Sequence, residues 1–347
     1  MAIKDVRNQG SQGPASKVRS WVEAFMNPLA GMTKRSIERM LEQKRLGNDA
    51  MLQVAYAEVE ANMPIFGITI DKRVAGVAGR AWDVVPVDES AAAKAQAEKV
   101  KKMFEKADMK NKDGLGRALE HLVLGAFRGR SCVKCFVDGE DLSFKALDNW
   151  NVLEKNGRLY WNPDLDVDMD VERLQEIPDG EVAWTSYARP VDQPGIMIYL
   201  RQLVGEEQWA RFVEKQGIPQ VILTPPEGTS DSQQDEWMYR AMRIFEGGSG
   251  VIPPGGQVTE LTAGRGQDPF TDYVRHQMET ISILATGGTL LTLGGSTGLN
   301  SNLADVQLAQ FETLVNRDCK QIQNALNGSA VPQICRKALG QPQLCRF

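Results

Sequence analysis

Three short stretches of the sequence contain residue types whose spacing can support chemistry. Cys132 and Cys135 form one C-x-x-C inside SCVKCFV, a spacing used by zinc sites and by dithiol redox centres. Residues 164–172, DLDVDMDVE, alternate carboxylates with apolar residues, as some cation-binding loops do. Residues 287–298, GGTLLTLGGSTG, have the glycine-rich composition of a phosphate-binding loop.

Each of these patterns is incomplete. The C-x-x-C has no second cysteine pair and no histidine partner nearby, so we expect buried, unreactive thiols on a strand. The acidic stretch lacks the glycine at position six and the glutamate at position twelve of an EF-hand, and we expect a solvated hairpin edge. The glycine-rich stretch lacks the lysine of a P-loop and a buried strand before it. The remaining cysteines are scattered along the chain: Cys319, Cys335 and Cys345.

The sequence contains two histidines, His121 and His276, and neither has a metal-ligand spacing or lies beside a nucleophile motif. We therefore expect no catalytic residue, no metal site and no cofactor. A net charge of −5 gives no basic footprint for tight nucleic-acid binding. The sequence has no apolar run of about 18 residues and no signal peptide. We expect a protein that is cytosolic, or assembles from the cytosol, without a membrane segment.

The N-terminal part of the sequence predicts an arm followed by helices. Residues 1–20 are polar, and residues 21–48 contain a short amphipathic helix. Asn48 or Asp49 is expected to cap the helix over residues 50–62. The helix that follows begins at Pro64, and two glycines, Gly76 and Gly79, are expected to let it pack close against a neighbour. In the helix within residues 21–48, the apolar positions are Met32, Ile37, Met40 and Leu41. In the helix that begins at Pro64, they are Phe66, Ile70, Val74 and Val77.

The middle of the sequence predicts a small antiparallel sheet covered by helices. Residues 81–87 are strand-like, and residues 89–107 form an alanine-rich surface helix. Asp138-Gly139 and Asn156-Gly157 each lie between alternating apolar runs, which is the pattern of a two-residue hairpin turn. Residues 181–190 add one strand. Strands and helices do not alternate as in βαβ units, so the expected fold class is α+β.

The second half predicts a long helix, a short strand and a returning helix. Residues 194–217 form one helix, or two helices divided at Gly205, and an apolar strand follows in IPQVILTPPEG. Ser230 or Asp231 caps the return helix. A glycine- and proline-rich hinge, residues 247–266, leads to a helix that ends at the Gly/Thr stretch. A last helix, residues 303–327, precedes a short tail.

Five segments of this half and of the N-terminal helices occur in a fixed order: IFGITIDKRVAGVAGRAWDVVP, WARFVEKQGIPQVI, SDSQQDEWMYRAMRIFEGGSGVIPPGGQVTELTAG, ILATGGTLLTLGG and SNLADVQ. In this order they resemble the portal proteins of Mu-like phages, over roughly residues 50–327. The family's Glu-Lys-Tyr-Gly-Ile-Pro has Gln216 here in place of its tyrosine, and its Ile-Leu-Gly-Gln-Thr-Leu-Thr is expanded to ILATGGTLLTL. Many relatives continue well past this C-terminus, which implies a minimal or absent crown.

The resemblance implies a phage portal fold with a helix-rich wing, a small antiparallel sheet, a pair of stem helices, a short clip and a glycine-rich tunnel loop. The implied parts are an N-terminal arm and helix (residues 1–48), the wing (49–193), a descending stem helix (194–217), the clip (218–229), an ascending stem helix (230–248), a wing return and channel helix (249–285), the tunnel loop (286–302) and a C-terminal helix with a short crown or tail (303–347).

The same resemblance implies two functional segments. The clip contacts the packaging motor or the connector through Ile218, Gln220, Val221, Ile222, Leu223, Thr224, Pro225, Pro226 and Glu227. The tunnel loop approaches DNA through Gly287, Gly288, Thr289, Gly294, Gly295, Ser296, Thr297 and Asn300.

The function implied by the resemblance is a ring of about twelve copies at one capsid vertex. Double-stranded DNA passes through it during packaging by the terminase motor and later during ejection, without sequence-specific contacts. The implied partners are further copies of the chain, the major capsid protein, the terminase large subunit and a head–tail connector. The implied location is the virion, after assembly in the host cytoplasm. A capsid or head-assembly protein without a DNA channel is the alternative class.

Residues in both functional segments have a second interpretation. The strand of residues 218–229 either pairs with a neighbouring subunit or forms a surface turn between two packed helices. The Gly/Thr stretch is either a tunnel loop or a flexible linker. The basic residues near the stem either contact DNA or form surface and intersubunit ion pairs: Arg201, Arg211, Lys215, Arg240 and Arg243.

Overall fold

A computed structural model of the chain describes residues 32–163, 171–216, 220–224, 257–261, 269–289 and 301–347, together with residues 230, 236, 239 and 293. The chain divides into two compact units. One contains Arg201–His276 with Met1–Asn27, and the other contains Pro28–Leu200 with Gln277–Phe347.

The larger unit is built on a three-stranded antiparallel sheet with the order β3-β2-β7, formed by Asp141–Leu147, Arg130–Asp138 and Val182–Ser186. The predicted hairpin is present, but its two-residue turn is Gly139-Glu140, one residue later than the predicted Asp138-Gly139, because Asp138 pairs with Asp141 and Gly139 has φ 57°. A positive φ is the left-handed conformation that a tight hairpin turn requires and that glycine adopts without strain.

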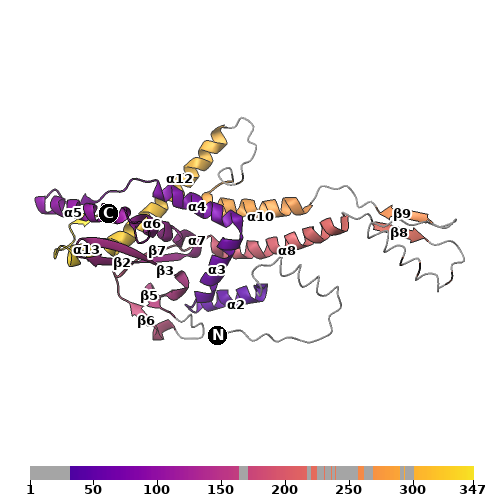
Figure 1. Cartoon of the computed structure of the whole chain (residues 1–347), viewed down its shortest axis with the longest axis horizontal. Coiled ribbons are helices and arrows are strands. Elements are labelled where there is room, and N and C mark those ends of the chain that lie inside the picture. Colours follow the sequence, from indigo (N-terminus) through magenta and orange to yellow (C-terminus); the bar gives the residue numbers. More distant parts are fainter. Residues whose placement is uncertain are drawn as a thin grey trace. The chain divides into compact units, whose positions relative to one another are not determined.

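Helices cover one face of this sheet (Figure 1). The main core lies between that face and the helices, and Val100, Phe104 and Leu122 are fully buried in it. The alanine-rich helix is therefore half core and half surface, because one of its faces packs on β3. The helices of this layer are α4 (Pro64–Ala78), α5 (Ala91–Asp108), α6 (Leu115–Val123), α12 (Ser301–Gly328) and α13 (Ala330–Lys337).

A second small sheet packs on the opposite face of β2. It has the order β4-β5-β6, formed by Val152–Lys155, Arg158–Trp161 and Gln175–Ile177. The hairpin predicted at Asn156-Gly157 is confirmed, since both residues have positive φ, 55° and 76°. This is the pattern of a type I′ turn.

Further short elements complete the larger unit. They are α2 (Lys34–Arg45), α3 (Ala50–Asn62), α7 (Gly125–Arg128), the 3-10 turns η1 (Asn149–Asn151) and η2 (Val171–Arg173), and the strands β1 (Val85–Pro86) and β10 (Cys345–Arg346). The strand-like residues 81–87 contribute a strand only at β1.

Some of the helix starts predicted from the sequence are confirmed by the structure. Pro64 occupies the first turn of α4, as predicted. Asp49 precedes α3 but makes no capping hydrogen bond, whereas the side-chain oxygen of Asn48 accepts a hydrogen bond from the amide of Ala50 (3.3 Å). The Asp49 carboxylate instead pairs with Arg130, at 2.6 Å from each of two guanidinium nitrogens. Asp49 therefore stabilises a contact between α3 and β2.

The two glycines of α4 have different roles. A Cβ at Gly76 would lie 2.7 Å from Cγ2 of Val315 in α12, so the close packing predicted there is confirmed. The same prediction for Gly79 is wrong. Gly79 ends α4 as its C-cap, and a Cβ there would meet only the carbonyl oxygen of Ala75 in its own helix.

The C-terminal segment belongs to the core and is not a tail. β10 pairs with β1 in antiparallel register, with Cys345 opposite Pro86. The ring of Phe347 stacks on Trp82 with centroids 5.5 Å apart, and its backbone oxygen accepts a hydrogen bond from Gln323 (2.7 Å). In the described part of the chain, no helix is both long and apolar enough to cross a membrane.

Candidate functional site: the Gly/Thr loop and the short strand pair

The start of the Gly/Thr loop is fixed at the end of α10 (Pro269–Thr286). The buried hydroxyl of Thr286 lies 2.8 Å from the carbonyl oxygen of Ser282 and 2.9 Å from that of Gly288. Gly287 has φ 78°, the left-handed conformation that commonly follows the last residue of a helix. The amide of Gly287 donates a hydrogen bond to Ile283 (2.9 Å).

The first residues of the loop also pack against α12, the helix that follows it. A Cβ at Gly288 would overlap the side chain of Gln307, and a Cβ at Gly287 would lie 3.3 Å from Cβ of Gln310. Gly287 needs glycine because of its positive φ, whereas a side chain at Gly288 would require the flexible Gln307 side chain to move. Helix α12 thus holds the first residues of the loop in place.

A buried ion pair joins α4 to α12 and lies next to the end of α10. The guanidinium of Arg73 in α4 donates to Asp318 in α12 at 2.8 Å and 2.6 Å, and both side chains are at most 1% exposed. Arg73 also donates to the carbonyl oxygen of Ala285, near the end of α10 (3.2 Å). The hydroxyl of Tyr187 donates to the same carboxylate (2.9 Å). Arg73 therefore ties together the helices before and after the loop.

Burial and the adjacent Asp318 raise the pKa of Tyr187 above its ordinary value, so Tyr187 remains a hydrogen-bond donor. The guanidinium of Arg317 lies over the ring of Tyr187, 5.4 Å from its centroid. A fully hydrogen-bonded buried network of this kind fixes the relative positions of the elements that contribute to it.

A second buried acidic cluster lies where α8 (Asp192–Gln216) begins. Asp192 is 2% exposed and lies near Glu60, which forms a salt bridge with Arg128. Burial and then the charge of Glu60 raise the pKa of Asp192 well above its ordinary value. The single cation Arg128 thus faces two carboxyl groups.

Of the predicted tunnel-loop residues, the structure describes Gly287, Gly288 and Thr289. The amide of Leu293 donates to the carbonyl oxygen of Thr289 (2.8 Å). The others, Gly294, Gly295, Ser296, Thr297 and Asn300, lie outside the described residues.

The predicted clip strand is present as β8 (Gln220–Thr224), which contains Gln220, Val221, Ile222, Leu223 and Thr224. It pairs in antiparallel register with β9 (Gln257–Leu261), so that Ile222 lies opposite Thr259. The prediction of an unbroken hinge over residues 247–266 is therefore wrong at β9. Residues 220–224 form a strand, whereas residues 218–219 and 225–229 lie outside the described residues, so both interpretations of residues 218–229 stay predictions. Four clip residues, Ile218, Pro225, Pro226 and Glu227, lie outside the described residues.

Helix α8 is continuous through Gly205, and it begins two residues before Pro194. A Cβ at Gly205 would lie 2.7 Å from the ring of Tyr273 in α10, so this glycine permits close helix packing. The hydroxyl of Tyr273 donates to the carbonyl oxygen of Arg201 (3.3 Å). The return helix expected over residues 230–248 lies almost entirely outside the described residues.

The residues that first suggested chemistry have structural roles where the structure describes them. Cys132 and Cys135 are buried in β2 and belong to different cores on opposite faces of the sheet, so they do not form one site. Burial raises the pKa of each thiol to about 12. A ring nitrogen of His121 bonds to the carbonyl oxygen of Leu147 (3.1 Å), and burial lowers the pKa of this histidine. Among the described residues, no His, Cys, Asp and Glu group has the arrangement of a metal site.

The sequence profile of the portal protein of Mu bacteriophage matches residues 53–347. The chain belongs to the Mu-type portal protein family. The portal protein of Escherichia phage Mu is 24% identical over 314 residues, which cover 87% of this chain and 60% of the relative. The chain thus spans about three-fifths of the length of that curated relative.

Solved structures share the portal fold at low sequence identity. A chain from the neck of an empty gene transfer agent particle, computed with C6 symmetry, has a TM-score of 0.56 at 11% identity and covers 84% of this chain and 83% of its own. A chain from the virion of a native gene transfer agent particle has a TM-score of 0.53 at 10% identity, covering 88% and 83%. Together with the mixture of helices and small antiparallel sheets, these matches establish the expected α+β portal fold.

For this portal-family chain, sequence reasoning did not identify the Arg73–Asp318 pair. A signal was present, because Arg73 is seven residues after Phe66 and four before Val77, both buried on the same face of α4. Asp318 similarly lies between the buried Val315 and Ile322 of α12. One cation and one anion in the apolar stripes of two helices predict a buried pair, because a lone charge is costly there.

Proposed function

We propose that this chain is the portal subunit of a phage-type particle, which assembles into a ring of about twelve copies at one capsid vertex. The match to the Mu portal family over residues 53–347 is the observation that carries the proposal. Double-stranded DNA passes through the ring when the terminase motor packages it and again on ejection. The ring assembles in the host cytoplasm and remains in the virion.

In this proposal residues 286–302 form the tunnel loop. Two features of the described residues support it. The start of the loop is held rigidly between α10 and α12, and the buried Arg73–Asp318 pair lies under both helices. The loop sequence contains Gly, Thr, Ser and Asn but neither Lys nor Arg. Because affinity for DNA scales with the phosphates neutralised, such a loop contacts a sliding duplex without holding it.

Residues 218–229 form the proposed clip, which contacts the terminase large subunit during packaging and the head–tail connector afterwards. The antiparallel pairing of β8 with β9 supports a clip that contains a two-stranded sheet. In the described part of the chain this sheet has two strands, so each strand has one edge without a partner strand. An adjacent subunit or a connector strand fits such an edge by adding a strand.

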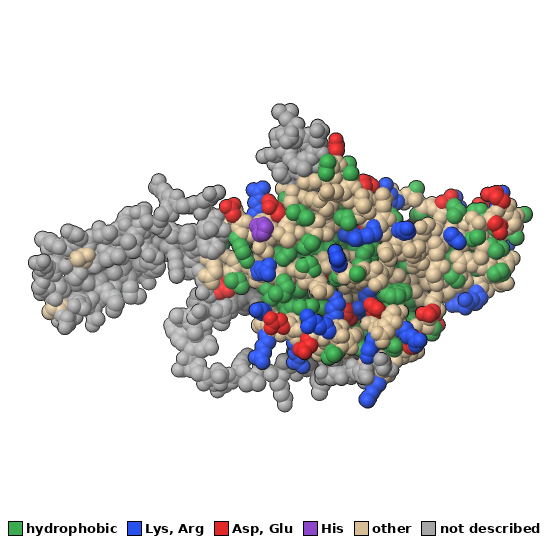
Figure 2. All heavy atoms as spheres, turned by 180° about the vertical axis from the view of Figure 1, so that it is seen from behind, with side chains coloured by type: hydrophobic (Ala, Val, Ile, Leu, Met, Phe, Trp, Pro, Cys, Tyr) green, Lys and Arg blue, Asp and Glu red, His purple; other side chains and the backbone are tan. Residues whose placement is uncertain are grey.

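The role proposed here is structural, and ATP hydrolysis belongs to the motor. On the face of the molecule in Figure 2, Lys and Arg side chains are interspersed with Asp and Glu. Mixed charge on that face suits contacts with the major capsid protein better than a continuous phosphate-binding track.

The ring is tested with the purified full chain by negative-stain electron microscopy and native mass measurement. We expect closed rings of one size. Shells or sheets without a central channel would support a head-assembly protein, and a monomer at every salt and protein concentration would contradict the portal function.

The tunnel-loop role is tested by deleting residues 294–298. We expect rings of unchanged size, because loops carry little core packing, together with impaired packaging or retention of DNA. A matched five-residue deletion in the polar N-terminal stretch, residues 9–13, should not affect DNA retention in assembled particles. If the variant that lacks residues 294–298 packages DNA normally, this stretch is a flexible linker and not a tunnel loop.

The clip is tested by replacing Val221 and Ile222 with Asp. Charge in a dry intersubunit strand pairing costs several kcal/mol, so motor docking or ring assembly should fail while the larger unit remains folded. Normal assembly and packaging by this variant would rule out the clip assignment.

A further inference from the structure

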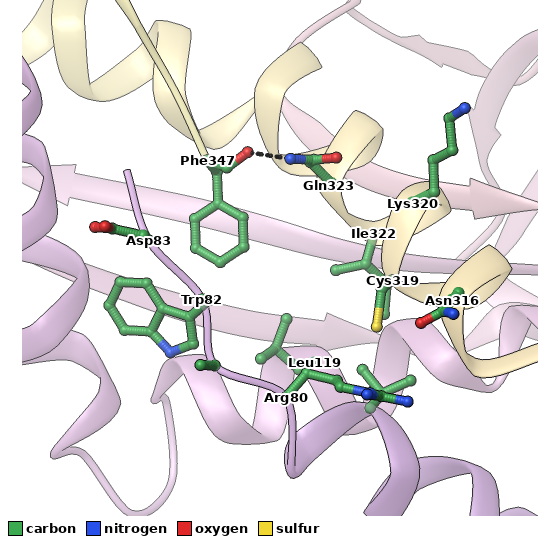
Figure 3. A pocket seen from close by; sticks show the side chains of 12 residues that line it. Arg80, Trp82, Asp83, Leu119, Asn316, Cys319, Lys320, Ile322, Gln323 and Phe347 are labelled. Carbon is green, nitrogen blue, oxygen red and sulfur yellow. Dashed lines mark hydrogen bonds between the residues drawn. The ribbon is translucent and has the colours of Figure 1, made fainter. Parts of the chain in front are cut away.

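A pocket of about 350 Å³ lies between the loop after α4 and one face of α12. Figure 3 shows the rings of Trp82 and Phe347 on one side, the α12 side chains on the other, and Leu119 between them. Val77 and Ile322 add to the apolar lining. The pocket is therefore an apolar depression on the helical side of the larger unit.

Among the described residues, the rim of this pocket has hydrogen-bond donors and one cation without a protein partner. Within the described part of the chain, the ammonium of Lys320, the amide of Asn316 and the indole N–H of Trp82 have no hydrogen-bond or ion-pair partner. The charged groups of the opposite rim are already paired. Asp83 binds Lys101 (2.9 Å), and Arg80 binds Glu312. Lys320 and Asn316 are exposed and Trp82 is half-buried, so these groups are available to a ligand with acceptor oxygens and negative charge.

The shape suits an extended peptide. The lining residues of α12 run from Asn316 to Gln323, two turns of one helix face, or about 10 Å. About three residues of an extended chain span that distance. In an extended chain successive side chains point to opposite sides, so a fitting peptide alternates acidic and apolar residues.

The chain itself contains such a peptide. Residues 164–172 read DLDVDMDVE, in which Asp164, Asp166, Asp168 and Asp170 alternate with Leu165, Val167 and Met169. We propose that the pocket binds this acidic segment from a second copy of the chain. Its apolar side chains enter the pocket, and its carboxylates meet Lys320, Asn316 and the indole of Trp82 at the rim.

The pocket and strand β5, which precedes the acidic segment in the sequence, lie on opposite sides of the larger unit. The pocket is on the helical face of the β3-β2-β7 sheet, and the segment continues from β5, which packs on the other face. Contact between two different surfaces is head-to-tail, and it closes into a ring when successive copies are rotated by about 30° for twelve members. This inference rests on the proposed ring.

Cross-linking tests the contact, because Cys319 lines the pocket and the other four cysteines are buried. Met169→Cys is introduced, rings are purified, and a short bis-maleimide is added. We expect a ladder of cross-linked dimers, trimers and higher multiples on a denaturing gel. Adding Cys319→Ser should abolish the ladder. Met109→Cys, at a position 83% exposed on the larger unit, should give none.

Each other outcome is decisive. Rings that form without a Met169→Cys ladder overturn this contact and leave the portal function standing. A product that migrates as a monomer means that the segment reaches its own pocket, which also overturns the contact. If Cys319 is protected from maleimide in rings but no ladder forms, another partner fills the pocket. A chain that never assembles contradicts the portal function as well.

Charge reversal gives an independent readout. Lys320→Glu should reduce the cross-linked fraction several-fold, and Asp168→Lys in the same chain should restore it, because the pair then has opposite charges again. Lys94→Glu, on the exposed face of α5, serves as the matched control. Loss without rescue would show that Lys320 does not face the acidic segment.

Discussion

Two ion pairs to α12, one from α4 and one from the loop after it, differ in burial and therefore in their contribution to stability. Arg73 and Asp318 are at most 1% exposed, whereas Arg80 and Glu312 are each 44% exposed. A surface pair contributes little because water solvates each charge when the other is removed. A buried pair leaves an unsolvated charge when one partner is lost. Helix α12 takes part in both kinds of pair, through Asp318 and through Glu312.

We predict that Arg73→Met lowers the free energy of unfolding by about 3–5 kcal/mol, because Asp318 and the hydroxyl of Tyr187 lose their partner. Arg80→Met should cost less than about 1 kcal/mol. Urea unfolding of the two variants at neutral pH measures the difference. Equal, small losses would mean that water reaches Asp318.

Asp192 makes the free energy of unfolding depend on pH. Its pKa in the folded state is raised by burial and by Glu60, whereas in the unfolded chain it has the ordinary value of about 4. Between these two values the folded state holds one more proton than the unfolded state. Stability therefore falls as the pH rises through this window, and the full penalty remains above the folded-state value.

Asp192→Asn is expected to remove this dependence. The slope of the unfolding free energy against pH should become less negative by up to about 1.4 kcal/mol per pH unit within the window, and the variant should be more stable than the parent at neutral pH. Denaturant unfolding between about pH 4 and pH 8 measures it. Asp83→Asn is the control: Lys101 lowers the pKa of Asp83, so the effect of this carboxyl on stability lies below about pH 4, and the slope between about pH 4 and pH 8 should match that of the parent. An unchanged slope in Asp192→Asn would show that Asp192 is ionised throughout.

At the scale of elements, contact distance decides the effect of glycine. Gly67 and Gly76 are both in α4, where glycine lowers helix stability relative to alanine. A Cβ at Gly67 would meet nothing within 4 Å, whereas a Cβ at Gly76 would meet Val315 at 2.7 Å. Helix propensity is the same at both positions, so the expected effects of a Gly→Ala substitution differ only because α12 lies close to Gly76.

Gly67→Ala should raise the free energy of unfolding by about 0.5–1 kcal/mol, because it restricts the unfolded backbone. Gly76→Ala should lower it by about 1–3 kcal/mol, since α12 must shift away from α4. Thermal unfolding of the two variants compares them directly. Stabilisation by both substitutions would contradict the close packing of α4 and α12.

At the scale of the whole molecule, the C-terminal segment joins elements that are far apart in the sequence. Phe347 packs on Trp82 and on Phe104, with ring centroids 5.5 Å and 4.9 Å apart. β10 supplies a strand to β1, and the backbone of Leu344 donates to the side chain of Gln96 (2.6 Å). These contacts close one end of the main core.

Phe347→Ala is expected to lower the free energy of unfolding by about 3 kcal/mol, because it leaves a cavity beside Trp82. Met109→Ala is the matched control, since Met109 is 83% exposed and should change stability by less than about 0.5 kcal/mol. Urea unfolding followed by tryptophan fluorescence measures both. A loss below about 1 kcal/mol for Phe347→Ala would show that the segment does not contribute to the core.

The sequence by itself determined the features that depend on neighbouring residues. The two hairpins, with turns at Gly139-Glu140 and Asn156-Gly157, the start of α4 at Pro64 and the periodic helices all follow from local backbone preferences. The ordered motifs also identified the portal family. The tertiary structure alone decided the partner of β8, the pairing of Arg73 with Asp318 across 245 residues, and the burial of Phe347. Many strands and charges in one chain satisfy the same local pattern, and only the packed core brings one particular pair within contact distance.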